Sequence, residues 1–320
     1  MVTLKDVAKR ANVSKMTVSR VINHPQLVTD ELKELVHQAM EELGYTPNKA
    51  ARALAQNRTM VVKVLILEEM DITEPYFMHL INGIARGLDK YHYALQLVTE
   101  NTYDLGGSDG FIISGMTRQD YEWVSQIKEP VIIFGENDIP MPFVDSDNHQ
   151  CVYDMTKTVI QRGYDHLVYV GMDVEELFAE SRVKGFESAV AEHPNISSAV
   201  YSVKNSSSQA EAFINQLEVQ ANTCFVCATD RIALGVQRAL AARPDLGDNY
   251  GITGYDGVFL DQIASPKMTT VKQDWLAMGQ LCVELLMQRI EGKPLDQVAN
   301  YCPAKIIIRD TIRPLEGETA

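Results

Sequence analysis

Residues 2–23 of this 320-residue chain read VTLKDVAKRANVSKMTVSRVIN, a stretch that predicts two short helices joined by a tight turn. Thr3 is suited to cap the first helix, because Asp6 lies three residues later and can reach back to the Thr3 backbone. Asn12 tolerates the left-handed backbone that ends a helix, and Ser14 can then cap the second helix. A gap of about three residues between two helices is typical of a helix-turn-helix.

A third helix is expected to open near Thr29 and to end at Gly44, which completes a small helical bundle. In a helix-turn-helix, the N-terminal end of the second helix enters the major groove of DNA. The side of that helix opposite its apolar residues presents Lys15, Met16, Ser19 and Arg20. Lysine and arginine pair with guanine, methionine can contact a thymine methyl group, and short polar side chains suit phosphate. From this pattern alone, a three-helix bundle with a solvated polar face is the alternative.

The net charge of −14 is unusual for a protein that binds DNA, but the charge is unevenly distributed along the chain. Residues 1–58 carry nine basic and six acidic side chains, a net charge of +3, which leaves −17 on the remainder. Such a basic head can approach phosphate while the acidic body is repelled from it.

Four segments resemble the N-terminal headpiece of the LacI/GalR family of bacterial repressors: residues 2–8, 13–23, 43–48 and 50–54. The resemblance implies a hinge helix over about residues 48–55 that orders on operator DNA. It also implies that Leu54 wedges into the minor groove and that Lys15 and Met16 set operator preference. The local sequence alone also allows Leu54 to be an ordinary apolar residue of a short linker helix. The predicted DNA-binding residues are Thr3, Lys5, Ser14, Lys15, Met16, Thr17, Ser19, Arg20, Asn23, Asn48, Ala51 and Leu54.

From Val61 onward, apolar strand segments alternate with helical segments, in the rhythm typical of parallel sheets. Residues 254–256, 269–274 and 279–294 resemble the closing third of the same family, so the resemblance covers essentially the whole chain. It implies a core like that of periplasmic sugar-binding proteins, in which two lobes share three crossovers and the ligand lies in the cleft. The prediction is a helix-turn-helix headpiece at 1–46, a hinge and linker at 47–59, and a two-lobed α/β core with parallel sheets at 60–320.

One segment departs from the family pattern. Only Thr99–Asp109 connects the strand that ends at Val98 to the strand that begins at Gly110, whereas the family usually fits a helix there. The segment contains Gly106 and Gly107, so this helix is predicted to be deleted or reduced. The change affects a flank that helps to frame the lobe near the headpiece.

In open α/β sheets, ligands lie beyond the carboxyl ends of the strands. That rule and the resemblance together predict seven effector-binding residues: Tyr76, Phe77, Ser114, Asp145, Arg182, Thr229 and Asp256. Planar polar side chains suit paired sugar hydroxyls, and aromatic rings suit the C–H faces of a sugar. The resemblance assigns ligand contact to Arg182 and Asp256, whereas Thr229 stands where many relatives carry asparagine. The alternatives are a turn or cap role for Asp256, a structural ion pair for Arg182 and a core position for Phe77.

Three further expectations concern buried or structural residues and the location of the protein. Cys224 and Cys227 lie three apart on a predicted strand and so point to opposite faces, which favours core packing over a metal or redox role. Asp230 is predicted to be the N-cap of a helix over Ile232–Ala242. The sequence has neither a long apolar run nor a signal-peptide core, so the protein is expected to be cytoplasmic and to have no membrane partner.

No common catalytic motif is found, and no cofactor or metal is expected. The sequence therefore predicts a transcriptional repressor that binds double-stranded operator DNA and responds to a small-molecule effector, either a sugar or a phosphosugar. This repressor is expected to be a homodimer. The tail after Pro314 shows no heptads, which argues against a coiled-coil tetramer. A sugar-binding protein or a sugar-modifying enzyme without operator binding is the alternative.

Overall fold

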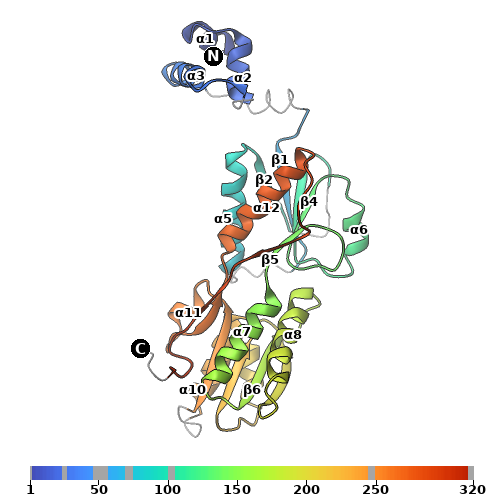
Figure 1. Ribbon diagram of the computed structural model, residues 1–320, viewed down its shortest axis with the longest axis vertical. Helices are drawn as coiled ribbons and strands as arrows, with labels where there is room; N and C mark the ends of the chain where they lie inside the picture. Colours follow the sequence, from blue (N-terminus) through green and yellow to red (C-terminus); the bar gives the residue numbers. More distant parts are fainter. Residues whose placement is uncertain are drawn as a thin grey trace. The chain divides into compact units, whose positions relative to one another are not determined.

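The computed structural model describes residues 2–23, 27–45, 57–68, 75–99, 105–243 and 249–315, and these fall into two compact units (Figure 1). One unit is Met1–Met60 with Gly107–Asp109, and the other is Val61–Gly106 with Gly110–Ala320. The predicted hinge residues Asn48, Ala51 and Leu54 lie outside the described residues.

The described part of the N-terminal unit contains α1 (Leu4–Arg10), α2 (Lys15–Asn23) and α3 (Asp30–Glu42). Apolar side chains at helical spacing meet in one core, in which Val7, Val18 and Val36 are fully buried. Only residues 11–14 separate α1 from α2, so the predicted helix-turn-helix is confirmed.

Local hydrogen bonds set the ends of these helices as the sequence predicted. The Asp6 carboxylate accepts the Thr3 backbone N–H at 2.8 Å, and the Thr17 N–H donates to Ser14 Oγ at 3.0 Å. Asn12, at the turn, has a positive φ of 53°. The turn therefore depends on side chains within the quoted stretch itself.

The C-terminal unit has two lobes, each built on a six-stranded sheet. The strand order in the first lobe is β11-β5-β4-β3-β1-β2, and every recorded pairing is parallel. These strands are β1 (Val61–Ile66), β2 (Ala94–Val98), β3 (Gly110–Ser114), β4 (Val131–Phe134), β5 (Phe143–Ser146) and β11 (Ala299–Cys302). The helices of this lobe are α5 (Pro75–Lys90), α6 (Tyr121–Ser125) and α12 (Trp275–Ile290).

The second lobe has the strand order β12-β10-β9-β8-β6-β7, with only β12 antiparallel to its neighbour. Its strands are β6 (His166–Met172), β7 (Ser197–Val203), β8 (Thr223–Cys227), β9 (Tyr250–Asp256), β10 (Thr269–Lys272) and β12 (Lys305–Ile307). Its helices are α7 (Asn148–Gln161), α8 (Leu177–Ala191), α9 (Ser207–Ile214), α10 (Asp230–Ala241) and α11 (Leu260–Ile263).

The chain passes between the lobes three times, after β5, after β10 and after β11. The predicted fold, two lobes with parallel sheets and three crossovers, is thus confirmed (Figure 1). Each crossover segment connects the two lobes. Its residues can therefore transmit a change in the orientation of one lobe to the other.

Helices cover the two faces of the first sheet unequally. On one face α5 packs tightly on α12, since a Cβ added to Gly83 would lie 2.4 Å from the carbonyl oxygen of Leu276. On the other face, α6 packs over Phe111 and Ile113. The described residues of Thr99–Asp109 form no helix, and the edge strand β2 is correspondingly exposed or only partly buried along its length.

Cys224 and Cys227 are free, fully buried thiols in the core of the second lobe, as predicted. Among the helices of the described ranges, none has the length and apolar character that a membrane span requires.

Candidate functional site

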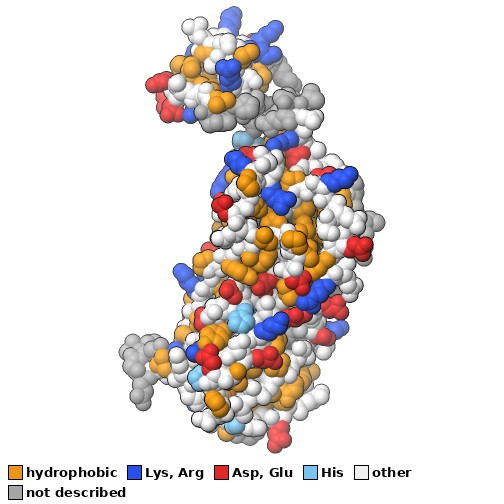
Figure 2. Space-filling model, turned by 45° about the vertical axis from the view of Figure 1, so that its right-hand side comes forward, with side chains coloured by type: hydrophobic (Ala, Val, Ile, Leu, Met, Phe, Trp, Pro, Cys, Tyr) orange, Lys and Arg blue, Asp and Glu red, His pale blue; other side chains and the backbone are white. Residues whose placement is uncertain are grey.

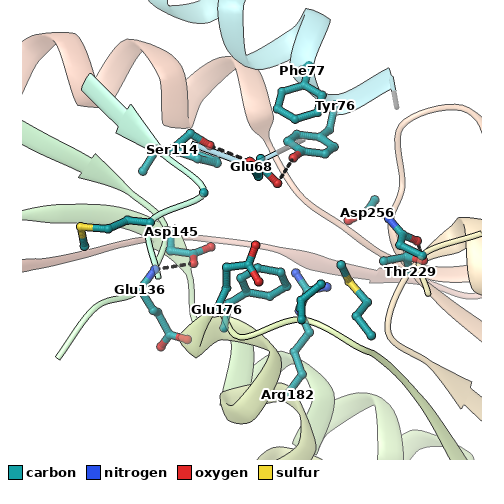
Figure 3. Close-up of a pocket in the computed structure, with 18 of the residues that line it drawn as sticks. Glu68, Tyr76, Phe77, Ser114, Glu136, Asp145, Glu176, Arg182, Thr229 and Asp256 are labelled. Carbon is teal, nitrogen blue, oxygen red and sulfur yellow. Dashed lines mark hydrogen bonds between the residues drawn. The ribbon is translucent and has the colours of Figure 1, made fainter. Parts of the chain in front are cut away.

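A cavity of about 740 Å³ lies in the C-terminal unit, where strands of both sheets end (Figure 3). The structure brings all seven predicted effector residues to its lining: Tyr76, Phe77, Ser114, Asp145, Arg182, Thr229 and Asp256. They come from both lobes, so a molecule in this cavity can contact both lobes at once.

Arg182, on α8, points into the cavity with part of its guanidinium group already engaged (Figure 3). Its Nε donates to Asn148 Oδ1 at 2.8 Å, and its Nη1 donates to the Ala228 carbonyl at 2.7 Å. The guanidinium carbon lies 3.6 Å from the Tyr255 ring centroid and 4.8 Å from that of Phe178. These contacts fix the plane of the group, and within the described residues no hydrogen bond is recorded for Nη2, which can serve a ligand.

Asp256 ends β9 in a backbone conformation that side chains rarely adopt, with φ at 126°. The side-chain amide of Gln273 donates to the Asp256 carboxylate at 3.2 Å, and the Trp275 indole donates to the Asp256 carbonyl at 3.3 Å. Such conformations persist where surrounding contacts enforce them, and they cluster at binding sites. The contacts to Gln273 and Trp275 join Asp256 to the crossover between β10 and α12.

On the first lobe, Glu68 links two of the predicted residues. Its carboxylate accepts the Tyr76 hydroxyl at 3.1 Å and the Ser114 hydroxyl at 3.0 Å (Figure 3). Glu68 directly follows the first apolar strand, so the strand-end rule could have identified it from the sequence. Its carboxylate lines the cavity, where a ligand hydroxyl can donate to it.

Four aromatic side chains form a continuous run along the cavity. Ring centroids lie 4.2 Å apart for Phe77 and Tyr76, 4.7 Å for Tyr76 and Trp275, and 6.0 Å for Trp275 and Phe134. Phe77 is only 4% exposed, so it supports the ring of Tyr76 and also lines the cavity. Trp275 and Phe134 were not among the predicted residues, and Trp275 lies about 200 residues from Tyr76 in the chain.

Asp145 is buried and fully engaged by groups of the protein. It accepts the backbone N–H of Glu136 at 3.0 Å, that of Ser146 at 2.7 Å, and the Asn148 amide at 3.0 Å. Burial raises the pKa of Asp145, whereas the nearby Arg182 and these hydrogen bonds lower it. Asp145 is therefore a structural anchor of the cavity wall as well as part of its lining.

Burial and the neighbouring carboxylate of Asp145 raise the pKa of Glu136 to about 7. The native state therefore binds this proton more tightly than the unfolded chain, whose glutamate titrates near 4.5. The contribution of Glu136 to the free energy of unfolding is complete below pH 4.5 and is lost as the pH rises through 7. Because the side chain is partly exposed and solvent screens its charge, the expected loss of stability is about 1–2 kcal/mol.

Replacing Glu136 with glutamine is expected to remove this pH dependence. The apparent melting temperatures of the two proteins are compared between about pH 5 and about pH 8. The wild type is expected to lose stability relative to E136Q as the pH rises. A difference that stays constant across this range would contradict the prediction.

The structure assigns the helix-capping role to Thr229 instead of Asp230, and Asp230 does not line the cavity. Thr229, rather than Asp230, is the N-cap of α10, because its hydroxyl oxygen accepts the Ile232 N–H at 3.1 Å. The same hydroxyl donates to Asn205 Oδ1 at 2.8 Å, so it is already committed to contacts within the protein. Asp230 is buried and accepts the Thr270 hydroxyl at 2.6 Å. The predicted N-cap at Asp230 is therefore wrong, because tertiary contacts draw its carboxylate into the lobe.

Contacts between the lobes lie next to the loop that lines the cavity. Arg118, which follows β3, donates to Glu180 of α8 at 2.6 Å. The neighbouring Gln119 amide donates to Glu175 at 3.0 Å. Glu176, between these two acids, lines the cavity, so the pair of contacts ties the first lobe to a wall of the cleft.

In the N-terminal unit, α2 presents the predicted recognition face. Lys15, Met16 and Arg20 are exposed, Met16 by 66%, whereas Thr17 and Ser19 are partly buried. On the face shown in Figure 2, Lys and Arg side chains project from this unit, which also carries acidic side chains, and acidic and basic side chains mix over the C-terminal unit. The exposed face of α2 therefore offers cationic and methyl groups to a partner.

The other residues of this unit that are predicted to contact DNA differ in whether their polar groups already form hydrogen bonds within the protein. Lys5 is exposed. The Thr3 hydroxyl donates to Asp6 at 2.7 Å, and the Ser14 and Thr17 hydroxyls lie 2.9 Å apart, so these groups already serve the helix ends. The side chain of Asn23 lies outside the described residues.

Comparisons with known proteins agree with both units. Residues 3–48 match the profile described as bacterial regulatory proteins, lacI family, and residues 156–312 match that of a periplasmic binding protein-like domain. The uncharacterized HTH-type transcriptional regulator YvdE of Bacillus subtilis (strain 168) is 46% identical over 315 residues, which cover 97% of this chain and 99% of the relative.

Two solved structures share the fold. A CelR–cellobiose complex has a TM-score of 0.71 at 24% identity, over 97% of this chain and 100% of that chain. A Lac repressor dimer bound to operator and the anti-inducer ONPF has a TM-score of 0.74 at 23% identity, over 97% and 98%. Because the identity to the Bacillus subtilis regulator extends over almost the full length of both chains, this protein belongs to the lacI family of bacterial transcriptional regulators.

Proposed function

We propose that this protein is a homodimeric repressor that binds a near-palindromic operator and releases or retains it according to a sugar bound in the cleft. The headpiece of each protomer (residues 1–46) reads one half-site, and residues 47–59 form the hinge at the operator centre. Residues 60–320 bind the effector and form the dimer. A protein that acts on chromosomal DNA works in the cytoplasm, and no enzymatic step is part of the proposal.

The observation that carries this proposal is the combination of two features in one chain. One is the exposed face of α2 with Lys15, Met16 and Arg20, and the other is the cavity between two lobes with its aromatic and carboxylate lining. One of the two solved relatives is a complex with cellobiose and the other is bound to operator, which supports both halves of the proposal.

The mechanism follows from the cavity and the crossovers. A sugar that contacts Arg182 on one lobe and Glu68 on the other stabilises one orientation of the lobes over another. A change in the relative orientation of the lobes moves the first lobe. The first lobe is connected directly to the hinge residues by the chain. The hinge then becomes more or less able to order on DNA.

A gel-shift assay on genomic fragments tests the proposal. The full-length protein is expected to retain a small set of fragments at low salt, and one sugar of a panel is expected to change that retention. Retention of no fragment would overturn the assignment as a DNA-binding regulator. Chemical conversion of a sugar by the purified protein would support the enzyme alternative instead.

The contact between Arg118 and Glu180 is expected to favour the lobe orientation that encloses the effector. Neutralising either partner (Arg118→Gln or Glu180→Gln) is expected to weaken effector binding by about twofold to fivefold, as befits a partly exposed ion pair. The double variant is expected to be no weaker than either single one, because both remove the same contact. Isothermal titration with the effector measures the three affinities.

The ion pair between Lys157 and Glu192 is a matched control. It is comparably exposed, spans 2.9 Å, and joins α7 to the end of α8 within the second lobe. Lys157→Gln and Glu192→Gln are expected to leave effector binding unchanged. Equal losses from both ion pairs would show that general destabilisation, and not lobe closure, is responsible.

A further inference from the structure

The cavity is larger than one sugar ring requires. At roughly 30 Å³ for each water-sized group, its 740 Å³ has room for about 25 such groups, about twice the non-hydrogen atoms of one hexose. A single ring would leave much of the cavity filled with water, whereas sugar ligands in such sites are mostly enclosed.

The aromatic run is likewise longer than one ring. The run from Phe77 through Tyr76 and Trp275 to Phe134 extends along the first lobe, and Phe178 adds an aromatic side chain on the second. Sugar rings present C–H groups that pack on aromatic surfaces. Aromatic side chains from both lobes therefore offer the cavity more than one surface on which a sugar ring can pack.

The described lining is rich in carboxylates. Six acidic residues line the cavity: Glu68, Glu136, Asp145, Asp173, Glu176 and Asp256. Burial raises the pKa of Glu136, Asp145 and Glu176, so these groups resist further negative charge beside them. A phosphate dianion would be repelled by the carboxylates that are ionised, whereas a sugar hydroxyl can donate to an ionised carboxylate or accept from a protonated one.

Among the residues that the structure describes, three cationic side chains line the same cavity, and each of them lies beside acidic or backbone partners. Arg182 lies within the electrostatic influence of Asp256 and Asp145, and two of its nitrogens are engaged by the protein. Lys204 follows Val203, whose carbonyl accepts the Asp173 N–H at 2.9 Å, so an acid lies beside it. Arg231 donates to the backbone of Asn205.

From the size, the aromatic run and the charge together, we infer that the effector is an uncharged oligosaccharide of at least two rings, and that the cleft excludes phosphorylated sugars. This inference rests on the proposed function and narrows it. The aromatic run packs against the ring faces, the carboxylates accept hydroxyl groups, and Arg182 Nη2 donates to a hydroxyl or ring oxygen.

A thermal-shift measurement on the full-length protein tests the inference. The probes are maltose, maltotriose and cellobiose on one side, and glucose, glucose 6-phosphate and fructose 1,6-bisphosphate on the other, all at equal concentrations. At least one neutral oligosaccharide is expected to raise the melting temperature by about 5 °C at saturation, and the phosphosugars are expected to cause no shift. The inference is overturned if a phosphosugar or glucose stabilises the protein as strongly, or if none of the three oligosaccharides does.

A charge variant separates electrostatic exclusion from simple lack of fit. Glu176→Gln removes one carboxylate at nearly constant shape, so glucose 6-phosphate is expected to bind it several-fold more tightly than the wild type. Glu187→Gln, on the exposed side of α8, the helix that Glu176 precedes, is the matched control and is expected to behave as the wild type. Equal binding of glucose 6-phosphate to both variants would contradict exclusion by charge.

Operator retention without sugar is measured in parallel by gel shift. If operator is retained while no neutral oligosaccharide binds, the effector class is wrong and the regulator assignment stands. If neutral oligosaccharides bind while no DNA is retained, the regulator assignment fails and the ligand class stands.

Discussion

Asp256→Asn is expected to weaken effector binding by about 100-fold while operator binding remains intact, which yields a regulator that no longer responds to its effector. The change keeps the size of the side chain but replaces one carboxylate oxygen by a donor. A sugar that donates two hydroxyl hydrogens to this carboxylate loses charge-assisted hydrogen bonds of about 1.5–3 kcal/mol each. Isothermal titration measures the affinity, and a gel shift with and without effector measures the response.

Asp154→Asn is the control for Asp256→Asn. Asp154 is an exposed acid of α7 that accepts the Gln150 amide at 2.8 Å and does not line the cavity. Its neutralisation is expected to leave affinity and response unchanged. If Asp256→Asn binds effector as the wild type does, Asp256 is not a ligand residue, and its strained backbone has a structural cause.

Lys15→Ala is expected to lower affinity for the operator by about 10- to 100-fold, with a smaller effect on unrelated DNA. Lys15 lies in the first turn of α2 and is exposed, as a residue that reads base edges must be. A good contact to guanine contributes about 1–3 kcal/mol of discrimination. Fluorescence anisotropy with an operator selected from random DNA by the wild type, and with a scrambled fragment, measures both affinities.

Lys33→Ala removes the same charge from α3, where Lys33 pairs with Asp30 at 2.7 Å. This control is expected to change operator affinity little, because the ion pair is local to one helix. An equal loss of affinity for operator and scrambled DNA in Lys15→Ala would indicate a phosphate contact in place of base reading.

The N-terminal unit was predictable because its signals are local. Thr3 with Asp6, the left-handed Asn12 and the cap at Ser14 act within a few residues of one another, so they operate with little help from the rest of the chain. The order of strands and helices in the C-terminal unit was predictable for a similar reason, since each apolar strand is a short continuous run.

The candidate effector site was predictable in part. The rule that ligands lie beyond strand ends selected residues such as Ser114 and Asp256, which the structure places on one cavity. Trp275 was missed because no local pattern joins the start of α12 to the strand ends of the first sheet, whereas Phe134 ends β4 and could have been selected by the strand-end rule. The N-cap was predicted at Asp230 instead of Thr229 because two adjacent residues can each cap a helix, and a contact from Thr270 decides between them.

The helix-turn-helix with which the chain begins was thus determined by the sequence itself, since its caps and its apolar spacing are encoded within about 20 consecutive residues. The cavity was determined only by tertiary structure. Three crossovers place residues from both ends of the C-terminal unit on the same wall, where they bury carboxylates beside aromatic rings. Burial and proximity of this kind depend on distances between segments far apart in the chain, and these distances exist only once both lobes have folded.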